Sequence, residues 1–596
     1  MSLLSAKIGG VGEPVADPQE SGRQRRRRAR PPRESDLPIS PEIERVFDLI
    51  PEAGEGYRWY DYPYRFLSWL LSGWRRRLFP NSVRTWLNDR LNDLLQFNEH
   101  ERHKVMGRDS VLENLLVPPD EHVRVGGLWV VELFPPTELP ALERAMKRNG
   151  WSKPRAVPPH ESDNLATLER SRSQWGSRWW RLADVLPPKS NRFYSFHAHK
   201  MRLPESFDMV EIRAVQIGQG LTAAVAYFTP TDEARKSLDA VWHAAHEPMI
   251  VWENGRLIPL DRKYAAIRRI QAQRRMLRTE ARDWLAGKLP GSFAANNEQQ
   301  LVLELLLLDE FDPTTVVFAE GNERDVRFAR ANQMDVYRAV GIDIHDFEEI
   351  KAKSLPGLIL SQPDRRGRDI LADDPTWTLW GNTATVAAGF ERERELFGGT
   401  VAAVGHKVDN FYELLPMLAI VEYLGNADAR YARLRDRAST RHGKFRGRAL
   451  RDLRRSFLTL SLNITSIHRD VNEFWQSHGP VVISDFRIHE SRQRKTWRRA
   501  RGDRKSKPVR LDESIRKRLD RQITRLTEAD SDYRDILSTV ASLGASADAF
   551  KVGRWALWVA IASLAVATVT TLVADVGCSS VLQHLLIWND PATCGP

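Results

Sequence analysis

The feature that most constrains this chain is an apolar run near its C-terminus. From Trp555 to Val573 the sequence reads WALWVAIASLAVATVTTLV, which is 19 residues without a charge. As a helix this run is about 28 Å long, close to the roughly 30 Å hydrocarbon core of a bilayer. The sequence therefore predicts one transmembrane helix with Trp555 and Val573 at its ends.

The charges around this run predict its orientation. Lys551 and Arg554 lie just before it, and no Lys or Arg follows. The positive-inside rule then places the N-terminal body in the cytoplasm and the tail 574–596 outside the cell membrane. The two cysteines of the chain, Cys578 and Cys594, both lie in that tail. An oxidising space would allow a disulfide between them, and the alternative is two free or intermolecular thiols.

The net charge of +11 is concentrated in two segments. Residues 1–33 carry eight Lys and Arg against three Asp and Glu, and residues 487–510 carry eleven against two. The remaining chain is slightly acidic, which excludes a protein that is basic throughout. Residues 1–40 are predicted to be a disordered tail, whose basic stretch 23–33 is either solvated or in weak contact with an anionic partner (nucleic acid or lipid).

The sequence predicts an α+β fold: a cytoplasmic mixed α/β region, then a long coiled-coil-like helical stalk, then the single membrane helix. The expected parts are a basic tail (1–40), a helical aromatic-rich segment (41–117), an α/β region with room for two subdomains (120–390), a helical bundle (391–486), a basic loop (487–511), a stalk helix (512–554), the membrane helix (555–573) and an outer tail (574–596).

Within the α/β region, apolar runs and turn residues predict individual elements. These are a strand at 126–134, a helix at 135–151, a β-hairpin at 207–231 that turns at Gly218-Gln219-Gly220, helices at 231–246 and 260–286, a buried element at 301–308, and strands at 314–318, 355–360 and 376–380. The second of the two neighbouring helices is expected to be basic on one side, through Arg268, Arg269, Arg274, Arg275 and Arg278.

The aromatic-rich stretch at 57–79 has two interpretations. It holds Trp59, Trp69 and Trp74 and ends in three consecutive arginines. Aromatic residues beside basic ones are typical of a membrane interface. The continuous apolar run is short, however, and Pro63 interrupts it, so packing into a protein core is favoured.

Two heptad patterns predict long helices after residue 391. The first consists of Leu453, Phe457, Leu460, Ile464, Ile467, Val471 and Phe474, and a helix at about 407–437 is expected to pack against it. The second consists of Leu519, Ile523, Leu526, Asp530, Tyr533, Leu537 and Val540. No proline separates this second pattern from the apolar run, so the stalk should continue into the membrane and join copies of the chain into a homo-oligomer.

The basic segment 487–510 is expected to be a loop. In an upright stalk its end would lie roughly 58 Å from the membrane, at 1.5 Å per residue. Because the Debye length is about 8 Å, lipid would attract it only if the stalk lay flat. An anionic partner such as nucleic acid therefore remains an alternative to a solvated loop.

Two histidine pairs form the one metal-like pattern. His197 and His199 would share a face of a strand, and His243 and His246 would share a face of a helix. If the two elements met, they would offer three or four ligands for a metal ion. Core or surface histidines are the favoured interpretation.

The order of parts resembles that of the CorA-type divalent-cation channels. The stretch LWVVELFPPTELPALERAMKRNGW is similar to the strand, proline and helix that open the soluble domain of that family. The resemblance implies a cation channel or transporter subunit. Where the family has Gly-Met-Asn, however, this chain has Ala574-Asp575-Val576-Gly577-Cys578, and only VLQHLLIW follows in place of a second membrane helix.

The leading hypothesis is a single-pass, membrane-anchored cytoplasmic protein that works by partner binding or sensing. No phosphate-binding GxxxxGK[ST] loop, HExxH, GxSxG or GxGxxG motif occurs at a suitable place, so an enzyme is disfavoured and no catalytic residue or cofactor is expected. The alternatives are a divergent CorA-like cation transporter or channel subunit, and a metal-dependent enzyme without a recognisable motif.

Overall fold

The computed structural model divides the chain into two compact units, Met1–Met106 and Gly107–Pro596. Both contain helices, and the second also contains a large sheet, so the mixed α+β class is confirmed. The described residues are 41–106, 113–153, 163–174, 177–190, 197–253, 255–314, 335–342, 348–362, 376–409, 411–440, 447–476, 483–490, 507–573, 575–576 and 579–580.

The first unit is helical, as the sequence predicts. Its elements are α1 (Pro41–Leu49), α2 (Asp61–Leu71), the 3₁₀ helix η2 (Gly73–Leu78) and α3 (Asn81–Val105). Asp61 at the start of α2 is buried and accepts hydrogen bonds from the backbone N–H groups of Gly54 and Arg58, each at 2.8 Å. Unlike the favoured interpretation of the sequence, most of the aromatic side chains here are exposed, because α2 packs against α3 on one side and leaves its other side uncovered.

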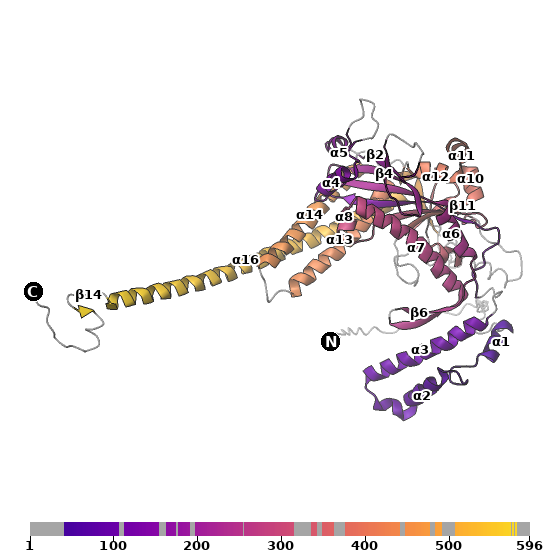
Figure 1. Ribbon diagram of the computed structural model, residues 1–596, viewed down its shortest axis with the longest axis horizontal. Helices are drawn as coiled ribbons and strands as arrows, with labels where there is room; N and C mark the ends of the chain where they lie inside the picture. The colour runs from indigo at the N-terminus through magenta and orange to yellow at the C-terminus, as the bar shows by residue number, and fades with distance from the viewer. Residues whose placement is uncertain are drawn as a thin grey trace, which may run out of the picture. The chain divides into compact units, whose positions relative to one another are not determined.

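An eleven-stranded mixed sheet organises the second unit (Figure 1). In spatial order its strands are β13 (Val509–Arg510), β12 (Phe486–Glu490), β9 (Glu348–Ala352), β10 (Leu358–Ser361), β11 (Thr376–Asn382), β8 (Leu301–Leu308), β1 (Val123–Phe134), β5 (Leu221–Pro230), β4 (Phe207–Ile217), β2 (Arg178–Leu186) and β3 (Ala198–Lys200). The central strands β1, β5 and β8 are buried along nearly their whole length, because helices cover both faces of the sheet.

Alternating side chains of these strands enter two separate cores. The helices on one face are α4 (Leu139–Asn149), α5 (Asn164–Arg172), α6 (Asp232–His243) and α7 (Arg262–Lys288). The helices on the other face include α8 (Ser292–Ala295), α10 (Thr383–Gly389), α12 (Thr400–Asp409), α13 (Leu414–Thr440), α14 (Gly447–Gln476) and α16 (Leu511–Val573). The remaining elements are α11 (Glu391–Phe397), η3 (Ile483–Asp485) and the small hairpins β6 (Met249–Glu253) with β7 (Arg256–Leu260) and β14 (Asp575–Val576) with β15 (Ser579–Ser580).

The turn between β4 and β5 shows why the predicted hairpin forms where it does. Gly218 has a φ of +57°, a left-handed conformation that glycine adopts without strain. The carboxylate of Asp470 on α14 accepts a hydrogen bond from the Gly220 N–H at 2.7 Å. A Cβ atom on Gly220 would lie 2.0 Å from Ser466 Oγ, so only glycine allows α14 to approach the turn this closely.

Most of the predicted elements of the α/β region are observed, and the basic segment is partly different. Its ends, 487–490 and Val509–Arg510, belong to the strands β12 and β13 rather than to a loop, because Phe486 and Ile488 pack into the core under α16. The residues 491–506 lie outside the described part, as do most of the strand predicted at 314–318, the tail 1–40 and both cysteines.

The first heptad pattern packs within the chain. From Phe457 to Phe474 its members are buried in the core formed with α13, α16 and the sheet. The early part of the second pattern, Leu519, Ile523 and Leu526, is buried in the same core. The first pattern thus packs against α13, in the region of the helix expected at about 407–437. The early part of the second pattern, which the sequence assigns to an intermolecular stalk, is used inside one chain, and a coiled-coil stalk stays a prediction.

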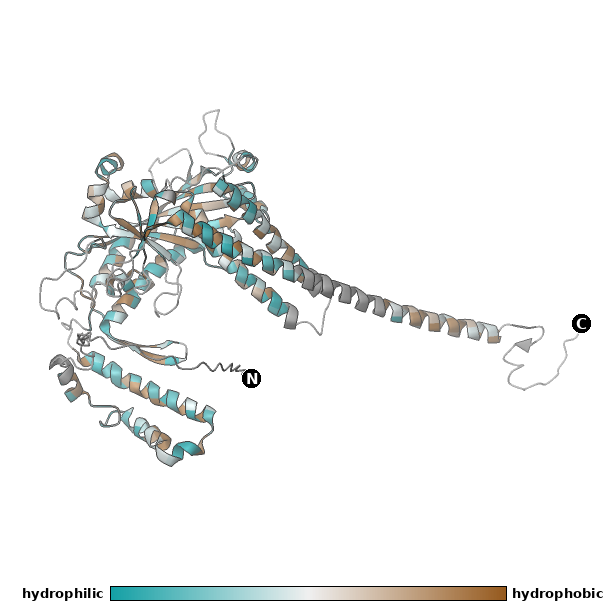
Figure 2. Cartoon of the chain, turned by 180° about the vertical axis from the view of Figure 1, so that it is seen from behind, coloured by the Kyte–Doolittle hydropathy of each residue, from teal (hydrophilic) through white to brown (hydrophobic). Residues whose placement is uncertain are grey.

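The helix α16 is 63 residues long and joins this core to the apolar run. Its C-terminal part, Val552–Val573, is the one helix in the described part of the chain that is long and apolar enough to cross a membrane, and none of it is buried. Figure 2 shows this end of α16 as a hydrophobic segment. The predicted membrane helix is therefore present as a helix, with its start three residues earlier.

Candidate metal centre and neighbouring cationic cleft

The structure separates the four histidines that the sequence suggests as metal ligands. His199 lies in β3, at one end of the sheet, and is buried, while His197 lies just before that strand. His243 ends α6, and His246 follows it with its Nε2 at 2.9 Å from the Val241 carbonyl oxygen. Burial lowers the pKa of His246, which favours a neutral ring there.

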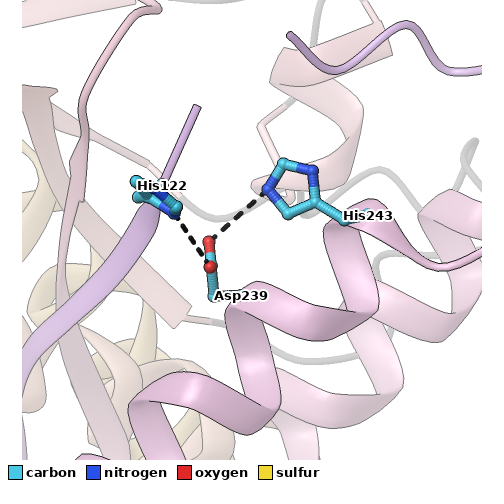
Figure 3. Close-up of side chains that lie close together, drawn as sticks. All are labelled: His122, Asp239 and His243. Carbon is cyan, nitrogen blue, oxygen red and sulfur yellow. Dashed lines mark hydrogen bonds and ion pairs between the residues drawn. The ribbon is translucent and has the colours of Figure 1, made fainter. Parts of the chain in front are cut away.

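A different set of ligands meets around His243. The side chains of His122, Asp239 and His243 place one potential ligand atom each within 4.8 Å of one another. In the part of the chain that the structure describes, this is the one group of three or more such residues, and His197, His199 and His246 do not belong to it. Figure 3 shows the Asp239 carboxylate between the two imidazole rings.

The helix α6 supplies two of these ligands from one face. Thr231 caps its N-terminus by accepting a hydrogen bond from Ala234 N, and Leu238 and Trp242 are buried against the sheet. Asp239 and His243 are one turn apart, so they lie together at the edge of this packed face. That edge borders the start of β1, where His122 immediately precedes the first strand residue.

Hydrogen bonds fix the positions of the three side chains. His122 Nδ1 donates to Asp239 Oδ2 at 3.1 Å, and the N–H of Val123 donates to Asp239 Oδ1 at 2.8 Å. His243 Nε2 donates to the carbonyl oxygen of Glu121 at 2.7 Å and lies 3.8 Å from Asp239 Oδ1. The hydrogen bond and the charge of Asp239 raise the pKa of His122.

The backbone under the group is also held in place. The carboxylate of Glu121 accepts hydrogen bonds from the N–H groups of Asp309 and Phe311, each at 2.7 Å. This contact joins the start of β1 to the segment that follows β8. The two ligands on α6 and the one before β1 are therefore attached to a rigid frame, which is what a metal site requires.

The donor set is suited to a divalent transition metal. Two imidazole nitrogens and one carboxylate oxygen are ligands of catalytic zinc and of non-haem iron, which keep further positions open. Tetrahedral zinc, at about 2.0–2.1 Å from each nitrogen, would separate the ligand atoms by roughly 3.3 Å. The observed contacts are 3.1 Å from His122 Nδ1 to Asp239 Oδ2 and 3.8 Å from His243 Nε2 to Asp239 Oδ1. To bind a metal, both nitrogens would give up the protons that they donate to Asp239 and to the Glu121 carbonyl oxygen, and the side chains would turn so that both lone pairs and one carboxylate oxygen converge.

A cleft of about 1150 Å³ is lined by chain neighbours of this group, although by none of its three members. Arg124, two residues after His122, and Arg235, one helical turn before Asp239, both line it. Its other charged lining residues are Arg181, Lys189, Arg213, Asp208, Glu211 and Asp232. Lysine and arginine outnumber carboxylates on the lining, but each of the four arginines is paired with a carboxylate, and Asp184 and Asp309 contribute from outside the lining.

The arginines of the cleft are held by carboxylates. Arg181 contacts Asp184 at 3.1 Å and Glu211 at 3.3 Å, and Arg213 contacts Glu211 at 3.3 Å. Arg213 also lies over the stacked rings of Trp179 and Tyr412. These contacts fix the guanidinium groups and reduce the positive charge that a ligand would meet.

Local sequence patterns could not identify this group. His122 and Asp239 are 117 residues apart and have no motif spacing. The predicted pair of His243 and His246 lies at the correct helix. The residue that joins His243 in the group, however, is Asp239, one turn earlier, and not His246. The signal that was available is the i,i+4 pair of Asp239 and His243 on one helix.

No family model, curated protein or solved structure matches the chain. The fold defines a class of protein in which one helix joins a mixed α/β body to an exposed apolar segment. Its function has to be inferred from its own geometry.

Proposed function

We propose that this chain is a single-pass membrane protein whose cytoplasmic body works by binding or sensing a ligand. The observation that carries the proposal is the continuity of α16. Near its N-terminus Leu511, Ile515 and Leu519 are buried in the body, and the same helix ends in the exposed apolar segment Val552–Val573. Such a segment is stable in a bilayer and unfavourable in water, because it buries no apolar surface within the chain.

The anchor is tested by membrane fractionation of the full chain and of a variant that ends at Phe550. The full chain should resist carbonate extraction, and the shortened one should become soluble. A reporter fused after Pro596 should be active only outside the cytoplasm, since Lys551 and Arg554 lie at the N-terminal end of the segment and no Lys or Arg follows. Reporter activity in the cytoplasm would overturn the orientation, and cation flux through liposomes would support the channel alternative.

The ligand that the geometry favours is a divalent transition-metal ion at His122, Asp239 and His243. Titration of the metal-free full chain in detergent with Zn²⁺ should give one site per chain. His122→Ala and His243→Ala should each weaken it by at least tenfold, because each removes one of three ligands. His468→Ala is the matched control, since His468 is exposed on α14 and outside the group. Unchanged binding in both ligand variants would refute the site.

Oligomerisation through the stalk is part of the proposal, but a shorter part of α16 is available for it than the sequence suggests. Because the seams up to Leu526 are buried within the chain, an intermolecular contact would use the later part of α16 and the apolar segment. Mass determination in detergent should show a homo-oligomer. A monomer at all concentrations would remove this part of the proposal.

The second candidate function is a metal-dependent enzyme. It is favoured by the position of the metal group beside a cleft lined by Arg124 and Arg235. A metal with an open coordination position can activate water, and arginines orient anionic substrates. Zn²⁺-dependent hydrolysis of p-nitrophenyl phosphate that is lost in His243→Ala would support it. Metal binding without hydrolysis would leave sensing as the better proposal.

A further inference from the structure

The first unit exposes an aromatic stripe along α2. Tyr62, Phe66 and Trp69 recur at helical spacing and are 57%, 59% and 54% exposed. Trp74 on η2 follows with 69% exposure. Large aromatic side chains gathered on one helix face are unusual on a soluble surface and indicate an interaction site.

Contacts between these side chains make the stripe a continuous patch. Phe66 and Trp69 stack with ring centroids 6.2 Å apart. The guanidinium of Arg75 lies over the Trp69 ring at 4.1 Å, and that of Arg65 lies 5.8 Å from the Tyr62 ring. The patch is therefore both aromatic and cationic.

The interior of the unit does not need this patch. The opposite side of α2 packs on α3 and is half-buried. Tyr60, next to α2, is buried and donates a hydrogen bond to Asn98 Oδ1 on α3 at 3.2 Å, while Trp59 meets Phe97 edge to face at 4.8 Å. The fold of the unit is thus satisfied by side chains other than those of the stripe.

The charge beside the patch is mainly positive, although the exposed Glu55 lines a shallow hollow with Arg65 and Trp69. Arg65, Arg75, Arg76 and Arg77 lie on α2 and η2, whereas the one acidic residue of these two elements, Asp61, is buried. A partner that complements an aromatic and cationic patch presents negative charges above an apolar layer. An anionic lipid surface does so, because tryptophan and tyrosine rings locate at the headgroup level and arginines bind the lipid phosphates.

We infer that the patch formed by Tyr62, Arg65, Phe66, Trp69 and residues 75–77 binds the anionic cytoplasmic surface of the bilayer that holds Val552–Val573. This inference rests on the proposed membrane anchor. The anchor ties the chain to one bilayer, so the patch meets that surface as a tethered ligand and weak contacts suffice for docking wherever the chain lets it reach. Each cation near an anionic surface strengthens binding roughly fivefold. The chain would thus contact its membrane at two places: the segment Val552–Val573 would cross the bilayer, and the patch would lie on its cytoplasmic surface.

The experiment places a nitroxide spin label on the full chain in nanodiscs. Cys578 and Cys594 are replaced by serine, and Phe66→Cys carries the label. Nanodiscs contain either phosphatidylcholine alone or phosphatidylcholine with phosphatidylglycerol. With the anionic lipid, the label at position 66 should become accessible to oxygen and shielded from a water-soluble nickel chelate. A label at Asn92→Cys, which is exposed on α3, is the matched control and should stay aqueous.

Charge variants separate docking from general electrostatics. Arg75→Gln with Arg76→Gln and Arg77→Gln should lower the ratio of docked to undocked protein on the order of 100-fold. Arg516→Gln with Lys517→Gln and Arg521→Gln removes the same charge from the exposed side of α16 and should leave docking unchanged.

Three outcomes would overturn the inference. The first is a label at position 66 that stays aqueous on anionic nanodiscs. The second is shielding that needs no anionic lipid and grows with protein concentration, which indicates a second copy of the chain as the occupant. The third is shielding that appears only when single-stranded DNA is added, which indicates nucleic acid. Circular dichroism of each variant excludes misfolding as the cause.

Discussion

The two faces of the large sheet bury different kinds of side chain. On the face covered by α13, α14 and α16, the strands contribute leucine, valine and tryptophan to a mainly apolar core. On the face covered by α6 and α7, the core also contains the ion pairs of Glu304 on β8 with Arg274 and Arg278. The centre of the first face is therefore specified mainly by volume, although Glu211 and Arg213 are buried at its edge. The centre of the other face is specified by charge as well, and the metal group lies at its margin.

The largest effect is expected from Glu304→Ala. Glu304 Oε2 lies 2.8 Å from Arg274 Nη2 and 3.1 Å from Arg278 Nη1, and all three residues are buried. Removing the Glu304 carboxylate takes away the negative charge that balances two buried guanidinium groups. This loss should lower the free energy of unfolding of the body by about 3–5 kcal/mol. Native-state hydrogen exchange of the β8 amides would measure the loss.

A triple variant sharpens this test. Arg274→Met, Arg278→Met and Glu304→Leu together replace the ion pairs by apolar groups of similar volume, so most of the stability should return. If Glu304→Ala exchanges like the wild-type chain, the two faces do not differ as described.

On the apolar face, stability should depend on the volume of the buried side chains instead of on their charge. Leu519 on α16 is fully buried, so Leu519→Ala leaves a cavity and should cost about 2–5 kcal/mol. Leu519→Met conserves the volume and should cost less than about 1.5 kcal/mol. Hydrogen exchange of α16 amides near this residue measures both. Equal losses in the two variants would mean that volume does not specify this face.

The charged face should also respond to pH through Glu132. Burial raises the pKa of this β1 carboxylate to about 7, although it accepts hydrogen bonds from Phe293 N at 2.8 Å and from Gln300 Nε2 at 2.6 Å. A raised pKa gives stability that is present below the unfolded value of 4.5 and is lost as the pH rises through about 7. The opening free energy should therefore fall by up to about 3 kcal/mol between pH 5 and 8.

The variant Glu132→Gln provides the control for this pH dependence. Its side chain does not titrate, so its opening free energy should be nearly flat over the same range. A wild-type chain as flat as the variant would show that the carboxylate does not change protonation there.

The sequence was informative where the pattern is local. The strand at 126–134, the hairpin around Gly218 and the apolar end of α16 were predicted because alternation, turn residues and hydropathy act over a few residues. The first heptad pattern was recognised too, and its helix exists. Its partner was expected to be a helix at about 407–437 of the same chain, and α13 packs against it. The early part of the second pattern was assigned to other copies of the chain, because a periodic apolar stripe does not distinguish another chain from the core of its own.

The pairing of charged groups could not be predicted. Arg274 and Arg278 were expected on the basic side of a helix, and the structure turns both inward to Glu304. Likewise the meeting of His122 with Asp239 depends on how α6 packs against β1. Such contacts are set by tertiary packing between distant segments, which one sequence without relatives does not reveal.

The smallest effect is expected at Asp232 on α6, on the same face of the sheet. Its ion pair with Arg235 measures 2.7 Å, as short as that of Glu304, but the Asp232 side chain is 76% exposed and that of Glu304 only 1%. Because water screens an exposed pair, Asp232→Ala should cost only about 0.5–1 kcal/mol by exchange of α6 amides. This cost should shrink further in 1 M salt, where the Debye length is about 3 Å, whereas the loss in Glu304→Ala should not change. A salt-independent loss at Asp232 as large as that at Glu304 would show that length alone, rather than burial, decides the strength of these ion pairs.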